Sequence, residues 1–276
     1  MSFEITEEDV PYHPDGHLCR MYLPKDEETK KRPVVLDLHG GTWTKNDRTL
    51  DVVCNQALAK AGFVVAAIDF RMGPTHQFPA SNQDIVQALR WLQTENIASQ
   101  YRLDTNQIGI LGTSSGGHLA LVAGIATNAY NADDETPVPV PKFIVALWPV
   151  SCPHQRYRYA KRAKRDDLIR CHEGYFGSEE IMKDASVPRL LMAGKTELDH
   201  NNKLPPLLLV VPGEDANVPL EINLDLLQCW QKCDGELDYA FFPKQAHAFG
   251  LYKENPETER MNKIIVDFCK RVTTSG

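Results

Sequence analysis

Short apolar runs alternate with amphipathic stretches along most of the chain. Continuous apolar runs, typical of strands buried on both faces, occur at 33–38, 63–68, 107–111, 143–148 and 206–211, and a further strand is expected at 237–242. Helical spacing of apolar residues covers 50–61, 81–94, a stretch from the end of the third run to about 127, 220–233 and 256–272. This alternation predicts an α/β fold, a mostly parallel sheet covered by helices on both faces.

Two segments depart from the alternation. Residues 3–10 and 17–23 flank a Pro- and Gly-containing turn, which predicts an antiparallel hairpin at the edge of the sheet. Residues 150–204 are basic and only locally amphipathic, so we expect an insertion, or cap, over the strand ends. The chain contains no repeats, and we expect residues 1–276 to form a single domain with this insertion.

A serine flanked by glycines follows the strand at 107–111. Gly112, Ser114 and Gly116 form the pattern G-x-S-x-G between an apolar strand and an apolar helix. In such a sharp turn, a β-carbon at either flank would collide with the adjoining strand or helix, which is why glycines are needed. The turn holds the serine hydroxyl in the open at a helix N-terminus. Ser114 is therefore the predicted nucleophile.

A serine hydroxyl needs a base before it can attack, and His247 has the required position. It follows the last strand and precedes the last helix, as the chain order nucleophile, acid, histidine requires. His39 and His118 are the competing histidines. We expect His39 to shape the loop at its strand end, and His118 to pack against the sheet from the helix after the serine.

The acid is expected in the loop after the strand at 206–211. Asp215 would fix the histidine tautomer and stabilise the imidazolium. Glu214 is the alternative, one residue away, and Asp215 is favoured because Asp-x-Asn-Val-Pro leads directly into the next helix.

Oxyanion-stabilising donors are expected from two backbone segments. The N–H of Ser115 lies at a helix N-terminus, and the loop His39-Gly-Gly-Thr-Trp43 offers the N–H groups of Gly41 and Thr42. This chemistry needs no metal and no organic cofactor. Cys229 and Cys233 lack a matching His or Cys pair, so a zinc site is not expected.

The composition of the chain indicates which partners and which cellular compartment to expect. The chain is 42% hydrophobic and 24% charged, as is typical of globular proteins, and its net charge of −7 argues against nucleic acid as a partner. No apolar run approaches the length of a membrane span, and residues 1–9 do not read as a secretory signal. Seven scattered cysteines favour reduced thiols and a cytoplasmic location.

A basic run within the expected insertion allows two interpretations. It comprises Arg156, Arg158, Lys161, Arg162, Lys164 and Arg165. The favoured interpretation is a solvated helix face. The alternative is that these charges steer an anionic substrate towards the active site.

Several motifs in order resemble those of a known family. They are His-Gly-Gly-Thr-Trp at 39–43, Asp-Phe-Arg at 69–71, Phe-Pro-Ala at 78–80 with Asp84, Gly-Thr-Ser-Ser-Gly-Gly-His at 112–118, Gly-Glu-Asp-Ala-Asn-Val-Pro at 213–219, and His-Ala-Phe at 247–249. Over residues 17–273 the chain resembles the α/β-hydrolase fold and, within it, the hormone-sensitive-lipase-like and feruloyl-esterase-like carboxylesterases. The resemblance implies Ser114 as nucleophile, Asp215 as acid, His247 as base, and hydrolysis of a small or medium-sized carboxylic ester.

Two departures from the family pattern keep alternatives open. Thr42 replaces the usual third glycine of the oxyanion loop and brings a side chain near the acyl pocket, and Asp215 follows Gly213 one residue sooner than is common. His-Gly-Gly-x-Trp is similar also to the kynurenine formamidases, which implies amide or formamide cleavage as the second hypothesis. A lactone hydrolase, a carbon–carbon bond enzyme and a ligand-binding receptor on an inactive scaffold are further alternatives.

Overall fold

The computed structural model describes residues 2–26, 30–131, 137–194, 196–198 and 203–274. Within them, eight strands form one sheet in the order β1-β2-β4-β3-β5-β6-β7-β8. The strands are β1 (Glu4–Pro11), β2 (Leu18–Lys25), β3 (Arg32–Leu38), β4 (Val64–Ile68), β5 (Leu103–Thr113), β6 (Ile144–Leu147), β7 (Leu207–Pro212) and β8 (Leu237–Phe242).

The strand directions confirm the predicted α/β class. β1 and β2 form the expected antiparallel edge hairpin, β2 also runs antiparallel to β4, and all the other pairs are parallel. β5 begins earlier than the apolar run at 107–111, because Leu103 pairs with Arg32 before a register shift. The polar residues of this first part hide it from a search for continuous apolar runs.

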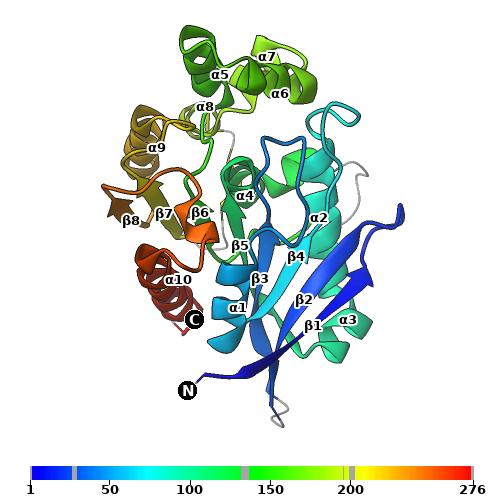
Figure 1. Cartoon of the computed structure of the whole chain (residues 1–276). Helices are drawn as coiled ribbons and strands as arrows, with labels where there is room; N and C mark the ends of the chain where they lie inside the picture. The colour runs from blue at the N-terminus through cyan, green and yellow to red at the C-terminus, as the bar shows by residue number, and fades with distance from the viewer. Residues whose placement is uncertain (1, 27–29, 132–136, 195, 199–202, 275–276) are drawn as a thin grey trace.

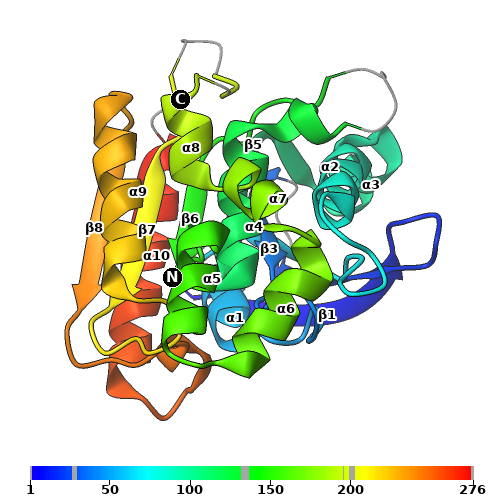
Figure 2. The same cartoon turned by 90° about the horizontal axis from the view of Figure 1, so that it is seen from above.

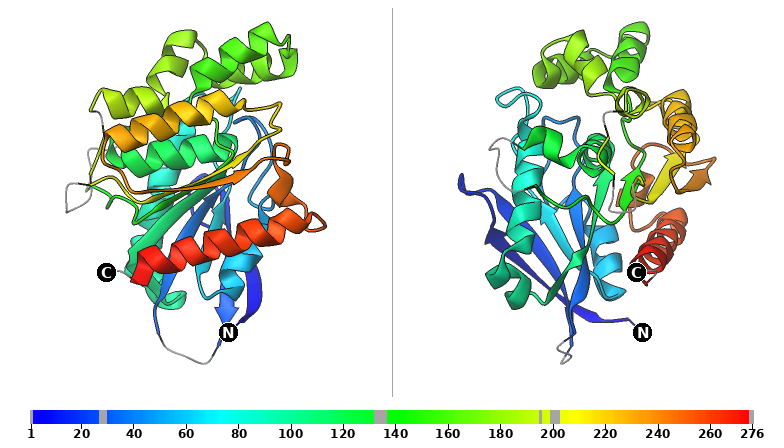
Figure 3. Two further views of the ribbon diagram at one scale, coloured as in Figure 1. Left: turned by 90° about the vertical axis from the view of Figure 1, so that its left-hand side faces the viewer. Right: turned by 180° about the vertical axis from the view of Figure 1, so that it is seen from behind.

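Helices cover both faces of the sheet (Figures 1 and 3). One face carries α1 (Val52–Lys60) and α10 (Pro256–Thr274). The other carries α2 (Ala80–Gln93), α3 (Glu95–Gln100), α4 (Ser115–Ile125) and α9 (Leu220–Lys232). Two short 3₁₀ turns lie at Thr127–Tyr130 and Phe249–Leu251. Each predicted helix is present within a few residues of its expected bounds, and α3 is an addition.

Burial on both faces explains why β4, β6 and β7 are apolar throughout and β3 is largely so. Alternate residues of β3 belong to different cores: Leu36 and Leu38 lie in the core under α2, α4 and α9, and Val35 lies in the core under α1 and α10. Burial of apolar area on both faces is the main favourable contribution to folding of such a sheet.

Between β6 and β7 the chain forms α5 (Pro153–Arg162), α6 (Asp166–Phe176), α7 (Glu179–Asp184) and α8 (Val187–Met192). Seen from above, this α5–α8 segment lies over the ends of the central strands and the N-terminus of α4 (Figure 2). It falls inside the insertion expected at 150–204, of which residues 195 and 199–202 lie outside the described residues. Among the described residues, no helix combines the length and the apolar character that crossing a membrane requires.

Candidate active site

Ser114 occupies the turn between β5 and α4 in a strained backbone conformation. Its φ and ψ are 53° and −113°, and its N–H donates to the carbonyl of Leu147 at 2.9 Å. Gly116 makes this turn possible, because a Cβ on it would lie 1.9 Å from the carbonyl oxygen of Leu38. The adjoining strand thus approaches the helix closely enough to hold the serine fixed.

His247 lies within hydrogen-bond reach of the serine. Its Nε2 is 2.9 Å from Ser114 Oγ, and its Nδ1 is 2.7 Å from Asp215 Oδ2. Because a carboxylate can only accept, Nδ1 carries the proton and Nε2 is left to accept the serine proton. The three side chains, which are predicted from three separate loops, therefore form one connected relay.

In the loop between β7 and α9, the carboxylate that faces His247 is that of Asp215. Asp215 Oδ1 accepts the backbone N–H groups of Asn217 and Val218 at 2.8 and 2.7 Å, so the side chain is held in an Asx turn. Its side chain is only 2% exposed, whereas Glu214 is exposed to solvent. The relay therefore contains Asp215, and Glu214 points elsewhere.

The competing histidines lie outside the relay. His39 stacks on Phe70 with ring centroids 4.3 Å apart, and its Nδ1 donates to the carbonyl of its own loop at Gly40. The expectation that His118 packs against the sheet is wrong. Its Nε2 donates to the carbonyl of Ala185, in the α5–α8 segment, and its Nδ1 accepts the indole N–H of Trp43. Burial lowers the pKa of His118 to about 4, so it is neutral.

The loop after β3 lies against the serine turn. A Cβ on Gly40 would lie 3.3 Å from Ser114 Cβ, so the backbone of Gly40 lies directly beside the serine. Gly41 and Thr42 follow with φ values of 137° and 54°, and the Thr42 hydroxyl donates to the carbonyl of Gly41 at 2.6 Å. Ser115 is the first residue of α4, and its N–H has no partner within the helix.

Trp43 anchors this loop. It is 1% exposed and has a φ of 60°, so two consecutive residues, Thr42 and Trp43, adopt the left-handed conformation that L-residues avoid. The rings of His172, Tyr175 and Phe176 pack around its indole. Packing on this scale can hold a strained loop that would otherwise relax.

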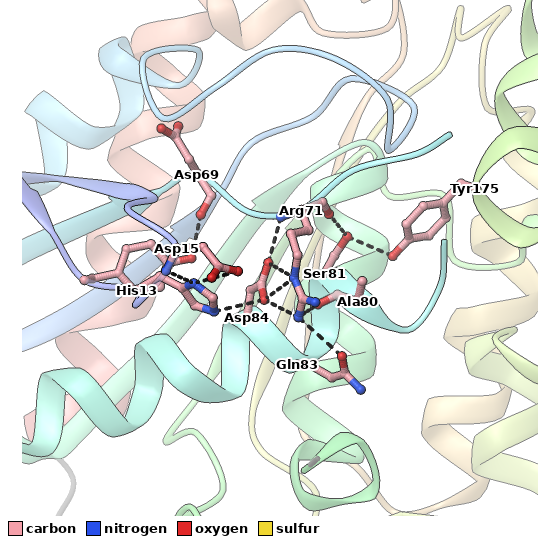
Figure 4. A network of polar contacts seen from close by, with 10 residues as sticks. His13, Asp15, Asp69, Arg71, Ala80, Ser81, Gln83, Asp84 and Tyr175 are labelled. Atoms are coloured by element: carbon pink, nitrogen blue, oxygen red, sulfur yellow. Dashed lines mark hydrogen bonds and ion pairs between the residues drawn. The ribbon is translucent and has the colours of Figure 1, made fainter. Parts of the chain in front are cut away.

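A polar network supports the ring that stacks on Trp43 (Figure 4). The Tyr175 hydroxyl donates to Ser81 Oγ at 3.0 Å, and Ser81 donates in turn to the carbonyl of Arg71 at 2.6 Å. Arg71 pairs with the fully buried carboxylate of Asp84, with 2.6 Å between Arg71 Nη2 and Asp84 Oδ1. Arg71 and Asp84 therefore anchor the loop after β4 to α2.

The basic run does not form one solvated face. Arg156 is fully buried against the Trp43 ring, with its Cζ 5.9 Å from the ring centroid, so its assignment to an exposed run is wrong. A helix turns 100° per residue, and position 156 faces inward while 158 and 162 face outward. Lys161 and Arg165 are paired with Glu179 and Asp167.

The described residues contain no group of three or more His, Cys, Asp or Glu side chains that could hold a metal. All seven cysteines are free, and those that are not buried, Cys171 and Cys233, are half-buried. The site brings together a serine hydroxyl, a histidine and a buried carboxylate within hydrogen-bond distance of one another.

Comparison with known proteins defines the class. Residues 19–143 match the model of the BD-FAE family. The fold is that of esterase B from Lactobacillus rhamnosis, whose inhibited crystal structure superposes with a TM-score of 0.79 at 21% identity, over 98% of this chain and 88% of that one. The chain is thus an α/β-hydrolase-fold protein.

Two relatives are similar to parts of the chain in sequence. Esterase LipC of Mycobacterium tuberculosis is 24% identical over 246 residues, 86% of this chain and 58% of LipC. Arylacetamide deacetylase of Mus musculus is 31% identical over 109 residues, 38% of this chain and 27% of the deacetylase. Over these ranges the chain is similar to an esterase and to an arylacetamide deacetylase. The matched part spans less than two thirds of the length of these relatives.

Proposed function

We propose that this protein is a serine hydrolase that cleaves a carboxylic ester of small or medium size through an acyl-enzyme. The observation that carries the proposal is the relay from Ser114 Oγ to His247 Nε2, and from His247 Nδ1 to Asp215 Oδ2, at 2.9 and 2.7 Å. A serine hydroxyl within 3 Å of a histidine that a buried carboxylate orients is the arrangement that activates this nucleophile.

In the first half-reaction, Ser114 Oγ attacks the ester carbonyl as its proton passes to His247 Nε2. Asp215 stabilises the imidazolium that forms. The negative charge on the carbonyl oxygen is met by the N–H groups of Gly41, Thr42 and Ser115. When the tetrahedral intermediate collapses, the C–O bond to the alcohol breaks and His247 gives its proton to the departing alkoxide.

In the second half-reaction, His247 takes a proton from water as the water oxygen attacks the acyl-serine. The bond between the acyl carbon and Ser114 Oγ breaks, and His247 returns the proton to the serine. The products are the carboxylic acid and the regenerated enzyme. No metal or organic cofactor takes part in these steps.

Labelling with a fluorophosphonate tests the nucleophile. We expect the wild type and a control variant at an exposed serine, Ser99→Ala, to be labelled equally, and Ser114→Ala to be unlabelled and inactive on p-nitrophenyl acetate and butyrate. An unlabelled but folded wild type would contradict the proposal and favour a ligand-binding receptor on an inactive scaffold.

Amide or formamide cleavage is the second candidate. It is supported by the relationship to a protein named arylacetamide deacetylase and by the His-Gly-Gly-Thr-Trp loop. The kcat/KM for N-formylkynurenine, compared with the values for the two p-nitrophenyl esters, distinguishes formamide cleavage from ester hydrolysis. A lactone in the same panel, with products identified by mass spectrometry, tests lactone hydrolysis and carbon–carbon chemistry on this scaffold.

We further propose that the α5–α8 segment is a cap within a single-domain enzyme and that its basic surface favours anionic substrates. A cavity of about 380 Å³ on this segment is lined by His154, Arg158, Lys161, Arg162, Glu179 and Lys183. In a chain of net charge −7, these cations create a local positive field. Reversing Arg158 and Arg162 to Glu should raise KM for a succinate monoester and leave KM for p-nitrophenyl butyrate unchanged. An equal change in both would contradict steering.

We also propose a cytoplasmic location, which the seven free thiols support. Fractionation of the source cells with an antibody against the protein would test it.

A further inference from the structure

Arg156 is the one cation of the basic run that lies wholly inside the protein, among the residues described. It extends from α5, and its side chain is completely buried. No carboxylate among the described residues lies within ion-pair distance of it, and its Nη1 is buried with no hydrogen-bond partner. Burying a guanidinium in this way lowers the stability of the folded chain. An arginine at position 156 therefore needs an explanation other than stability.

The guanidinium contacts the loop that carries the acid. Arg156 Nε donates to the carbonyl of Asn217 at 3.1 Å, and Nη2 donates to the side-chain Oδ1 of the same residue. Asn217 in turn donates its backbone N–H to Asp215 Oδ1 at 2.8 Å. One residue, Asn217, is therefore held from one side by Arg156 and itself holds the carboxylate that orients His247.

The same guanidinium lies against the oxyanion loop. It sits over the Trp43 ring, 5.9 Å from the centroid, in the geometry of a cation–π contact. Trp43 directly follows Thr42, and both hold left-handed backbone conformations. A shift of the Trp43 ring would therefore be transmitted to the adjacent N–H groups.

We propose that Arg156 is a positioning residue, which sets the acid loop at Asp215 and the oxyanion loop at Thr42–Trp43 relative to each other through contacts to Asn217 and Trp43. Its side-chain hydrogen bonds and its ring contact are made to these two loops and not to Ser114, so it acts through the loops. The inference rests on the function proposed above and concerns the rate of acylation. Misplacement of reacting groups by about 1 Å can reduce a rate about 100-fold.

The test uses the full-length chain with Arg156→Met, which keeps the length of the stem but removes the charge and the forked donors. We expect kcat on p-nitrophenyl butyrate to fall at least about 10-fold with KM within about 3-fold, because binding survives while alignment is lost. Arg156→Lys, which keeps the charge without the fork, should be intermediate. Arg170→Met, at an exposed arginine of α6, serves as the matched control and should behave as wild type.

Fluorophosphonate labelling separates positioning from simple loss of folded enzyme. In Arg156→Met we expect every molecule to be labelled, but about 10-fold more slowly than in the wild type. Labelling at the wild-type rate, or a reduced number of labelled molecules that accounts for the lost activity, would overturn the inference. An unlabelled wild type would instead overturn the proposed function itself.

Asn217→Ala supplies a second variant in which Arg156 stays in place. The backbone N–H to Asp215 is retained and only the side-chain acceptor of Arg156 is lost. The double variant combines Arg156→Met with Asn217→Ala. If Arg156 acts through Asn217, the kcat of this double variant should equal that of Arg156→Met within about twofold. Losses of kcat that multiply in the double variant would show that the two residues act independently and would contradict the proposed link.

Discussion

The rings of Trp43 and Tyr175 lie face to face, with centroids 5.6 Å apart and planes within 2° of parallel. Trp43 belongs to the loop after β3 and Tyr175 to α6, so this stack joins that loop to the α5–α8 segment. The Tyr175 hydroxyl is tied to Ser81 and, through it, to Arg71 (Figure 4).

Two substitutions of Tyr175 should therefore differ. Tyr175→Phe keeps the stack and loses one buried hydrogen bond, which should cost about 1 kcal/mol of unfolding free energy and little activity. Tyr175→Ala removes the ring, which should cost about 3–5 kcal/mol and lower kcat as well. Urea denaturation and steady-state kinetics of both variants provide the check, and equal losses in the two would argue against the stack as the source of stability.

The choice between Asp215 and Glu214 can be tested directly. Asp215→Asn leaves the shape of the site but cannot hold the histidine tautomer, so kcat should fall about 10⁴-fold. Glu214→Gln, at the exposed neighbour, is the matched control and should change kcat less than about twofold. A larger loss in Glu214→Gln than in Asp215→Asn would reverse the assignment.

A buried carboxyl beneath the site makes stability depend on pH. Burial raises the pKa of Asp37 to about 7 from 3.8, and burial together with the charge of Asp37 raises the pKa of Asp51. Between pH 4 and 7 the folded state thus binds more protons than the unfolded chain, so stability falls as the pH rises. Below pH 4 this penalty is absent, because both states are protonated.

Asp37→Asn should remove the larger part of this dependence. The amide keeps an oxygen to accept from Asn55 Nδ2, which now lies 2.7 Å from Asp37 Oδ2. At pH 8 the variant should be more stable than the wild type by on the order of 2–4 kcal/mol, and at pH 4 about equal to it. Urea denaturation at pH 4, 6 and 8 measures the difference, and a difference that does not change with pH would refute the explanation.

Two glycines of α4 provide a matched pair for the nucleophile turn. A Cβ on Gly116 would meet the backbone oxygen of Leu38 at 1.9 Å, whereas one on Gly124 would meet the side-chain Cδ1 of Ile144 at 2.3 Å. A backbone carbonyl cannot move without shifting β3, but the end of an isoleucine side chain can rotate. Gly116→Ala should therefore cost about 3 kcal/mol or more and reduce activity, and Gly124→Ala less than about 2 kcal/mol.

Thermal and urea unfolding of both glycine variants would check this prediction. Helix propensity favours alanine over glycine at both positions, so a loss of stability confined to Gly116→Ala would report the contact with Leu38. If Gly116→Ala were as stable and as active as Gly124→Ala, the turn would have space for a Cβ at position 116, and the predicted clash with Leu38 would be wrong.

Local pattern was enough to place the strands and helices that carry the site. Most buried strands contain a continuous apolar run, and parallel strands end at the same edge of the sheet, so the loops bearing Ser114, Asp215 and His247 had to meet there. The chain order of the three residues then matched the requirements of acyl transfer. For these reasons the α/β class and the candidates Ser114 and His247 follow from the sequence, whereas the choice of Asp215 over Glu214 depends on the contacts of Asp215 in the folded chain.

The burial of Arg156 and the partners of His118 depend on tertiary contacts, which no local sequence pattern encodes. Arg156 and Arg158 are both arginines in one basic run, yet one is fully buried over Trp43 and the other lines an outer cavity. His118 turns away from the sheet because Trp43 and Ala185, from other parts of the chain, offer partners for its two nitrogens. Periodicity reports which side of a helix is apolar, but a buried cation or a neutral histidine is stabilised by partners distant in the sequence, and only the folded chain brings these together.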